Sequence, residues 1–480
     1  MKLVNIQYKK YFLMFADLST LTLAFLLSWI ISEGLRHHFF PELANPTLLG
    51  KITGQPLVFV IPAFIIISFS WIWGHYTRFK PFWDEQYDII KIVLLAITID
   101  IIFLFVVKSH FSRIWIGVTV SLMLFLLPMG RVVAKKIMIK CGIWFTPTII
   151  VGTGKNALEA AQTIESDSMM GHKVIGLIDL AETRETSEKT FSGYPVFPSI
   201  RSATETRQNL GNPYVVIALE NSDEHQQFDH KISEWISACP NAMIVPPMLK
   251  LPLYGTEVVH VFRRETLLLR LQNNLSRPLP RFLKRTFDLL VAPTLLILLT
   301  PLFIYLIMKI RKDGGNAIFA HKRIGLGGKP FQCYKFRTMK PDAQAILDKL
   351  LQNNKILNEE WQRDHKLKND PRITEIGKFL RQTSIDELPQ LINVIKGEMS
   401  LVGPRPIVEE ELEKYGTDQR YYLEARPGMT GIWQISGRND TSYERRVELD
   451  TWYVRNWSLW YDVVILIKTI PEVFQQRGSY

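Results

Sequence analysis

Long apolar segments near the N-terminus constrain this chain more than any other feature of its 480 residues. They cover about residues 11–31, 56–73, 92–107 and 114–129, and the second of them contains no charged residue. A helix needs roughly 20 apolar residues to cross the core of a bilayer, and polar side chains at its ends can extend a shorter segment. The sequence therefore predicts a membrane protein in which residues 1–140 form a bundle of four transmembrane helices.

The loops between these segments alternate in positive charge. Basic residues such as Lys9, Lys80 and Lys136 are frequent before the first segment, between the second and third, and after the fourth. The two remaining loops hold fewer of them. Because cytoplasmic loops carry the excess of lysine and arginine, the N-terminus and everything after Lys140 are expected in the cytoplasm.

A fifth apolar run, residues 289–308, has basic residues at both of its ends, which fits a segment that enters and leaves the membrane on one face. Pro301 follows Thr300 inside this run, where it removes a backbone donor and crowds the preceding turn, so a helix break is expected there. We therefore predict a re-entrant membrane helix at residues 284–311. The alternative is a kinked spanning helix, which would place all later residues outside the cell, away from nucleotide-activated substrates.

Residues 146–261 have the pattern of a truncated Rossmann-like α/β domain. The stretch TPTIIVGTGKNALEAAQTIE reads as a strand, a turn at Gly152 and Gly154, and a helix. Its G-x-G-x-x-A spacing is close to the dinucleotide fingerprint, and HKVIGLIDL adds a second strand that ends at Asp179, where a ribose-binding acid would lie. The glycines either bind a nucleotide or only form the turn, and the pattern is compatible with both.

This glycine loop suggests an alternative function, a membrane-anchored nucleotide-sugar dehydratase or epimerase. Such an enzyme is expected to carry Tyr-x-x-x-Lys on a helix beside the nucleotide. The spacing occurs at Tyr305 with Lys309, inside the apolar run, and at Tyr76 with Lys80, ahead of the middle domain. Neither pair suits a cofactor at Gly154, so this alternative lacks its catalytic residues.

Residues 276–480 carry the densest motifs and are predicted to form a mainly α-helical domain. Many of its basic residues stand at turn-like sites beside Gly, Pro or Ser, and with the net charge of +11 they suit a polyanionic substrate such as a pyrophosphate. The sequence has no Cys/His cluster and no aromatic platform for RNA, so nucleic acid is not expected as a partner. The candidate phosphate-binding residues are Arg323, Lys335, Arg337, Arg381, Arg405, Arg426 and Arg438.

The stretch TSIDELPQ places two adjacent acids, Asp386 and Glu387, before Pro389. Ser384 and Glu387 match the capping box S-x-x-E, which is an ordinary helix start. If Ser384 were the cap, however, Pro389 would fall where its amide should already bond to Ile385. If Asp386 is the cap, Pro389 falls in the first turn, where no donor is missed, and Asp386 lies at the positive helix end, which attracts phosphate.

The two carboxylates are expected to have separate roles, because neighbouring helical residues point in different directions. A carboxylate can attack phosphorus and form an acyl phosphate. Mg²⁺ typically binds one or two carboxylates together with phosphate oxygens. The acidic pair, which is surrounded in sequence by basic residues at turns, suits both the attack on phosphorus and the binding of Mg²⁺.

Aromatic residues gather near the C-terminus, just before the apolar stretch VVILI. Aromatic side chains favour the membrane interface, but they also fill protein cores. Both interpretations remain open for Trp452, Tyr453, Trp457, Trp460 and Tyr461.

The motifs KFRTM, TSIDELPQLINVIKGEMSLVGPRP and RPGMTGIWQISGR resemble the signature of the bacterial sugar transferases that act on polyprenyl phosphate. The whole chain is similar to the large members, which have four helices ahead of the catalytic core. The resemblance implies that galactose-1-phosphate, or a related hexose-1-phosphate, passes from a UDP-sugar to undecaprenyl phosphate with release of UMP. This reaction is the first membrane step of O-antigen, capsule or exopolysaccharide synthesis.

The resemblance also implies residue roles. Asp386 matches the family nucleophile, which carries the sugar phosphate as a covalent intermediate, and Glu387 matches the second acid. Mg²⁺ is expected at this site with Asp386 as its ligand, and Pro301 matches the helix break. Such an enzyme is expected in the bacterial inner membrane, with the catalytic domain of residues 276–480 on the cytoplasmic face. A homodimer is compatible with the sequence.

Overall fold

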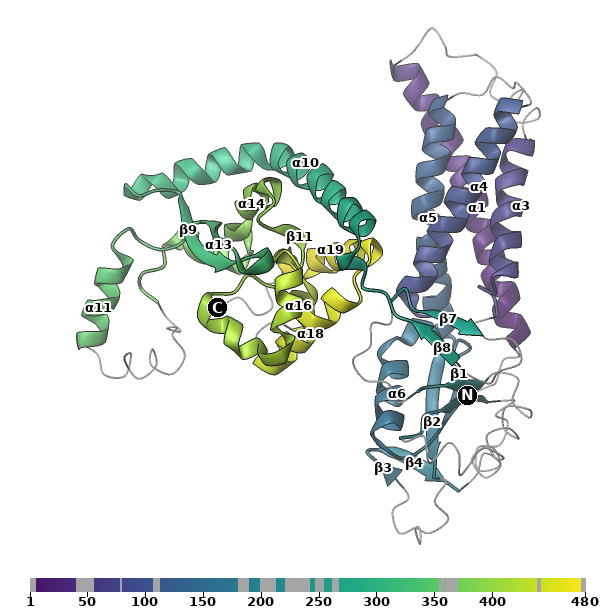
Figure 1. Ribbon diagram of the computed structural model, residues 1–480. Coiled ribbons are helices and arrows are strands. Elements are labelled where there is room, and N and C mark those ends of the chain that lie inside the picture. The colour runs from purple at the N-terminus through teal and green to yellow at the C-terminus, as the bar shows by residue number, and fades with distance from the viewer. Residues whose placement is uncertain are drawn as a thin grey trace. The chain divides into compact units, whose positions relative to one another are not determined.

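Helices α1 (Ile6–Phe39), α3 (Pro56–Ile72), α4 (Phe82–Val106) and α5 (Arg113–Lys140) form the N-terminal bundle of the computed structural model (Figure 1). The chain divides into two units, Met1–Met248 and Leu249–Tyr480, and each is described by itself. The structure describes residues 6–39, 56–77, 80–106, 113–179, 190–198, 213–220, 242–246, 254–260, 267–353, 358, 370–437 and 442–475.

Apolar side chains fill much of the interior of the bundle and also cover its outer surface. Leu21, Ile66 and Met123 are buried between the helices, whereas Phe64 and Phe105 are exposed on the outer surface. Helices α1, α4 and α5 each contain a segment long and apolar enough to cross a membrane, and α3 is a shorter apolar helix of 17 residues. An apolar outer surface needs a lipid environment, so the prediction of a membrane protein is confirmed.

Charged residues are buried inside this bundle as a closed network. The guanidinium of Arg131 on α5 donates to Asp17 on α1 through Nε (2.9 Å) and Nη2 (2.7 Å), and to Glu85 on α4 through Nη1 (3.1 Å). Lys135 contacts the same Glu85, and the hydroxyl of Tyr76 donates to Asp17 over 2.7 Å. Each charge therefore has an opposite partner, which buried charges require.

A mixed sheet follows the bundle, with strand order β3-β4-β2-β1-β5-β6. β3 pairs antiparallel with β4, and the other neighbours are parallel. The strand, glycine turn and helix expected after residue 146 occur in that order. The elements are β1 (Thr146–Val151), α6 (Lys155–Ser166), β2 (His172–Ile178), β3 (Thr190–Phe191), β4 (Tyr194–Phe197), β5 (Tyr214–Ile217) and β6 (Ala242–Ile244).

The second unit is mainly helical among the residues described. Its strands form two antiparallel hairpins and one short parallel pair: β7 (Glu257–His260) with β8 (Leu267–Arg270), β9 (Ile318–Ile324) with β10 (Pro330–Phe336), and β11 (Ser400–Val402) with β12 (Gly428–Thr430). Its helices are α10 (Pro278–Ile310), α11 (Ala343–Asn353), α13 (Glu375–Gln382), α14 (Gln390–Lys396), α15 (Glu409–Leu412), α16 (Gln419–Glu424), α17 (Ile432–Ile435), α18 (Tyr443–Arg455) and α19 (Leu459–Gln475).

Helix α10 corrects one prediction. It runs without interruption from Pro278 to Ile310 and contains Pro293 and Pro301, so the chain is not broken at Thr300 and Pro301. Figure 1 shows it as an arch over the second unit. A proline inside a helix removes one hydrogen bond and bends the helix without ending it when the neighbouring turns hold. The hydroxyl of Thr300 donates to Leu296 O over 2.8 Å in the turn before Pro301.

Both ends of α10 are bound to the same unit. Near its start, the buried Lys284 donates to Val402 O over 3.0 Å and to Asp462 Oδ2 over 2.7 Å. At its end, Arg337 Nη2 donates to Ile310 O over 3.0 Å. The arch is therefore fixed at both ends to elements of one folded body.

The aromatic residues near the C-terminus are expected either at the membrane interface or in the protein core, and the structure differs from one residue to the next. Tyr453 and Trp457 are buried in the core, where both donate to Asp462, so core packing is correct for these two. Trp452 is 37% exposed, so a contact with the membrane surface remains a prediction for that side chain.

Candidate active site

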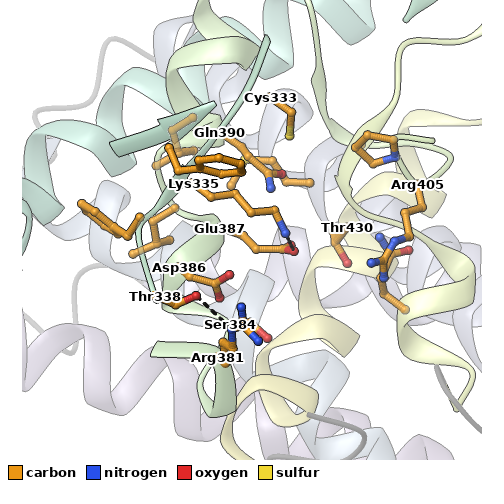
Figure 2. Close-up of a pocket in the computed structure, with 18 of the residues that line it drawn as sticks. Cys333, Lys335, Thr338, Arg381, Ser384, Asp386, Glu387, Gln390, Arg405 and Thr430 are labelled. Carbon is orange, nitrogen blue, oxygen red and sulfur yellow. Dashed lines mark hydrogen bonds and ion pairs between the residues drawn. The ribbon is translucent and has the colours of Figure 1, made fainter. Parts of the chain in front are cut away.

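A cavity of about 700 Å³ opens in the second unit between β10, α13, β12 and α17 (Figure 2). Both predicted acids line it, together with the basic side chains of Lys335, Arg381 and Arg405. These residues are up to 70 positions apart in sequence, since Lys335 lies on β10 and Arg405 follows β11. The fold therefore brings the acidic pair and five of the predicted cations to the cavity, because Arg323 and Arg337 line it as well.

The acids reach the cavity wall through an unusual turn. Ser384 has a φ of 54°, in the left-handed region that favours glycine, and it separates α13 from the 3₁₀ turn Ile385–Glu387. Its amide donates to Arg381 O over 3.2 Å, and its carbonyl accepts from the amide of Glu387 over 3.2 Å. The reversal places Asp386 and Glu387 inside a short tight turn at the cavity.

The prediction that Asp386 caps a helix is wrong. The following helix, α14, begins at Gln390 with Pro389 in the cap position, so Asp386 precedes it inside the 3₁₀ turn. The capping box is also not formed, because the side chain of Ser384 makes no capping hydrogen bond. Proline tolerates the cap position because it needs no donor there.

The two acids have different electrostatic environments. Lys335 Nζ lies 2.5 Å from Glu387 Oε1, so Glu387 carries its own counter-charge (Figure 2). Burial raises the pKa of Asp386 to about 6, and the charge of Glu387 adds to the rise, while Lys335 and Arg381 oppose it. Asp386 therefore has a raised pKa and is the less neutralised carboxylate of the pair.

Arg381 is held beside Asp386 by a close approach of two segments. A side chain at Gly377 on α13 would meet Thr338 O at 2.0 Å, so only glycine lets the segment that follows β10 pack there. The hydroxyl of Thr338 then accepts from Arg381 Nε over 2.9 Å, which aims the guanidinium along the cavity wall. Thr338 is a site residue that we did not predict, although it lies in the motif KFRTM.

Arg405 approaches from another side of the cavity (Figure 2). Its guanidinium lies 5.0 Å from the ring centroid of Trp433 on α17, a cation–π distance. Thr430 and Trp433 also line the cavity, and both come from the motif RPGMTGIWQISGR. These two residues carry no charge, which is why sequence analysis did not single them out.

The remaining predicted cations serve other contacts. Arg337 reaches the cavity wall, but its guanidinium pairs with Asp313 (Nη1–Oδ2 2.9 Å) and binds Ile310 O at the end of α10. Arg426 does not line the cavity, and its Nε donates to Gly397 O over 2.8 Å. Arg323 lies on the cavity wall near Pro406. Arg438 falls outside the described residues.

The other predicted sites lie elsewhere. Gly152 and Gly154 form the turn between β1 and α6 in the first unit, where Gly152 has a φ of 124°. Tyr305 and Lys309 lie on α10 in the second unit, with Lys309 Nζ 3.3 Å from the tyrosine oxygen, and Tyr76 bonds to Asp17 inside the bundle. No observation on these residues favours the dehydratase or epimerase alternative.

Comparison with known proteins identifies both parts of the chain. Residues 279–476 match the family described as bacterial sugar transferase, and residues 72–229 match a CoA-binding domain. The chain is 41% identical to the undecaprenyl-phosphate galactose phosphotransferase of Salmonella typhimurium, over 99% of this chain and 98% of that protein. It is 40% identical to the UDP-galactose-lipid carrier transferase of Erwinia amylovora, over 97% of this chain and 96% of that protein.

A shorter relative is similar over part of the chain. It is the exopolysaccharide production protein ExoY of Rhizobium meliloti, which is 52% identical over 42% of this chain and 91% of that protein. The two long matches cover nearly all of both partners, and the family match includes every element that lines the cavity. The chain belongs to the bacterial sugar transferase family.

Proposed function

We propose that this enzyme transfers galactose-1-phosphate, or a related hexose-1-phosphate, from a UDP-sugar to undecaprenyl phosphate and releases UMP. The names of the two long relatives support the galactose and the lipid carrier. The observation that carries the proposal is the unequal pair of acids in the cavity. Glu387 is neutralised by Lys335, whereas Asp386 has a raised pKa and is the better nucleophile.

In the first step, a carboxylate oxygen of Asp386 attacks the phosphorus that bears the sugar. The bond between that phosphorus and the oxygen bridging the two phosphates breaks, and UMP leaves with the electron pair. The sugar phosphate is then held on Asp386 as an acyl phosphate, which splits a difficult transfer into two steps. Arg381 lies beside Asp386 and neutralises charge on the phosphate under attack.

In the second step, a phosphate oxygen of undecaprenyl phosphate attacks the same phosphorus. The bond to Asp386 breaks, the carboxylate is regenerated, and the product is a sugar linked to the lipid through a diphosphate. Arg405, on another side of the cavity, provides a second cation for the incoming phosphate. Lys335 stays near the reaction because Glu387 holds its ammonium group.

The residues fit Mg²⁺. The ion takes one or two carboxylates and completes its shell with water and substrate phosphate oxygens. Asp386 offers such a carboxylate, and within the described ranges no group of three or more His, Cys, Asp or Glu forms a fuller cage. When bound, Mg²⁺ supplies positive charge that stabilises the departing phosphate.

The cavity is also suited to a lipid acceptor. Leu295 and Leu299 of α10 and Leu466 of α19 contribute to its wall, and Ile297 and Leu298 on the outer side of α10 are 72% and 69% exposed. Helix α10 is apolar, and both of its ends are bound to the same unit. These two features support a re-entrant segment, which enters one leaflet and leaves it on the same face. We propose that the catalytic unit lies on the cytoplasmic face of the inner membrane, where its basic flanks are expected.

The decisive experiment follows UMP release from a panel of UDP-sugars with undecaprenyl phosphate and Mg²⁺. We expect UDP-galactose to be the preferred donor. Without acceptor, the enzyme should release at most one UMP per site and gain the mass of a hexose phosphate on the peptide that contains Asp386.

Substitutions test the assignment of the two acids. Asp386→Asn should abolish both UMP release and the covalent adduct. Glu387→Gln should form the adduct slowly, because Lys335 loses its ion pair. Full activity of Asp386→Asn, or an adduct on another residue, would overturn the assignment of the nucleophile. Full activity of Glu387→Gln would show that Glu387 has no role in the reaction.

A further inference from the structure

The glycine turn after β1 has the form of a phosphate-binding loop, but a side chain of the protein itself occupies the place of the phosphate. Glu220 follows β5, and its Oε1 accepts a hydrogen bond from the amide of Asn156 over 2.7 Å. Asn156 is the second residue of α6, so this amide is one of the free donors that open a helix. Those donors are the ones that bind phosphate in dinucleotide-binding folds.

The space above the turn is filled by the same side chain. A Cβ atom placed at Gly154 would come within 2.1 Å of Glu220 Oε1 and 2.3 Å of its Cγ. In the dinucleotide fingerprint, the second glycine lets the pyrophosphate approach the backbone. In this chain the missing side chain of Gly154 admits Glu220 instead.

The neighbouring crevice is closed as well. In the order β3-β4-β2-β1-β5-β6, the chain reverses direction across the sheet between β1 and β5, and ligands of such sheets bind outside the carboxyl ends at this point. The side-chain amide of Asn156 donates there to Leu219 O (2.9 Å) and Val245 O (3.1 Å), which follow β5 and β6. Two side chains thus seal the place where a nucleotide would enter.

We propose that Glu220 is a built-in substitute for a ligand phosphate, and that the middle domain is a closed scaffold that does not bind the diphosphate of CoA or of a dinucleotide. The carboxylate supplies the negative charge that the end of α6 attracts, and it would repel a diphosphate brought to the same amides. The match to a CoA-binding domain then reflects the fold of residues 72–229, with its phosphate position already occupied.

Hydrogen–deuterium exchange of the full-length protein in lipid nanodiscs tests this proposal locally. The readout is the exchange rate in peptides that cover residues 152–160, with and without CoA, NAD⁺ or inorganic pyrophosphate. In the unmodified protein, millimolar amounts of each probe should leave the rate unchanged. Glu220→Ala should raise the rate on the order of tenfold, the effect of losing a helix cap, and pyrophosphate should slow it again by taking the vacated position.

A matched control lies on the same helix. Glu159 is exposed on α6, so Glu159→Ala removes the same charge without touching the loop and should leave exchange as in the unmodified protein. If Glu220→Ala does not fold, Glu220→Gln keeps an oxygen for the Asn156 amide but lacks the charge, and pyrophosphate should slow its exchange.

Three results would overturn the proposal. The first is protection of residues 152–160 in the unmodified protein by CoA, NAD⁺ or pyrophosphate. The second is an unchanged exchange rate in Glu220→Ala. The third is a failure of pyrophosphate to slow exchange in whichever Glu220 variant is folded. UMP release should be unaffected in all outcomes, because Glu220 lies in the first unit and the proposed reaction uses the second.

Discussion

The ammonium group of Lys335 lies 2.5 Å from the carboxylate of Glu387, and this ion pair makes two adjacent acids chemically different. Glu387 is stabilised as an anion by its partner. Asp386, one residue earlier, has a pKa raised to about 6 by burial and by the nearby charge of Glu387. The proposed reaction needs this division, because only one of the two acids attacks the phosphorus.

The first prediction concerns pH. The proposed nucleophile Asp386 can attack only when ionised, so kcat/KM should fall about tenfold per unit as the pH drops below about 6. Arg381→Met removes a charge that favours the ionised form, so the acidic limb should move to higher pH. The profile is measured as UMP release with saturating acceptor.

The control for this prediction is Arg445→Met, since Arg445 is an exposed arginine that pairs with Glu448. Its acidic limb should coincide with that of the unmodified enzyme. The second ionisation of the acceptor phosphate also lies near pH 6, but it cannot move with an enzyme substitution. An unmoved limb in Arg381→Met would therefore assign the titration to the substrate.

The second prediction concerns Asn393, a fully buried residue of α14. Its side chain accepts from Tyr334 N (3.0 Å) and donates to Gln332 O (2.6 Å) and to Glu398 (2.6 Å), so it fixes β10 against α14. Because Lys335 follows directly on β10, Asn393→Ala should shift the ammonium group away from Glu387. We expect kcat to fall by about tenfold or more while KM for the UDP-sugar changes little.

Steady-state kinetics and thermal unfolding together test the role of Asn393. Leaving two backbone groups unpaired costs about 1–3 kcal/mol each, so some loss of stability is expected in any case. An unchanged kcat in a folded Asn393→Ala enzyme would show that the residue only stabilises the fold.

The third prediction concerns the anchor of α10. Lys284→Met leaves Asp462 buried beneath the helix without its cation, which should lower the free energy of unfolding by about 3–5 kcal/mol. Burial already raises the pKa of Asp462, and the loss of Lys284 raises it further. A carboxyl group with a raised pKa in the folded state destabilises more as the pH rises above its unfolded pKa, so the loss should be smaller at pH 5 than at pH 8.

Unfolding midpoints at the two pH values measure this effect. The double substitution Lys284→Met with Asp462→Asn removes both charges but keeps an oxygen that accepts from Tyr453 or Trp457, so it should recover much of the stability. A Lys284→Met protein that is equally stable at both pH values would contradict the inferred contribution of the ion pair.

The fourth prediction concerns topology. A reporter fused after Lys312, beyond the end of α10, should be active in the cytoplasm because both flanks of the helix are basic. The matched fusion after Lys108, in a loop with few basic residues, should be active on the opposite side. A periplasmic signal after Lys312 would make α10 a spanning helix.

The residues of the candidate site could be predicted where their signal is local. Asp386, Glu387, Lys335 and Arg381 lie in short motifs where acids, bases and turn residues occur together, a combination that indicates a site for a charged substrate. The roles of Arg337 and Arg426 could not be predicted, because a guanidinium beside a turn serves equally well to bind a phosphate or a helix carbonyl. Only the position of Asp313 and of Gly397 decides between them.

Backbone conformation limited the prediction in two places. The sequence shows Pro389 but not the left-handed backbone of Ser384, and that conformation shifts the helix start to Gln390. Pro301 likewise indicates a weakened turn, whereas the packing of Phe303 and Leu306 against Phe336 and Leu380 supports a continuous helix.

The network around Arg131 also bears on how the protein is made. Arg131 binds acids of α1 and α4, and Asp17 precedes it by 114 positions. During synthesis from the N-terminus, Asp17 and Glu85 therefore reach the membrane before the residue that neutralises them exists. Completion of the bundle therefore depends on the arrival of α5, because a chain that stops before it would keep two acids at the membrane without their cations.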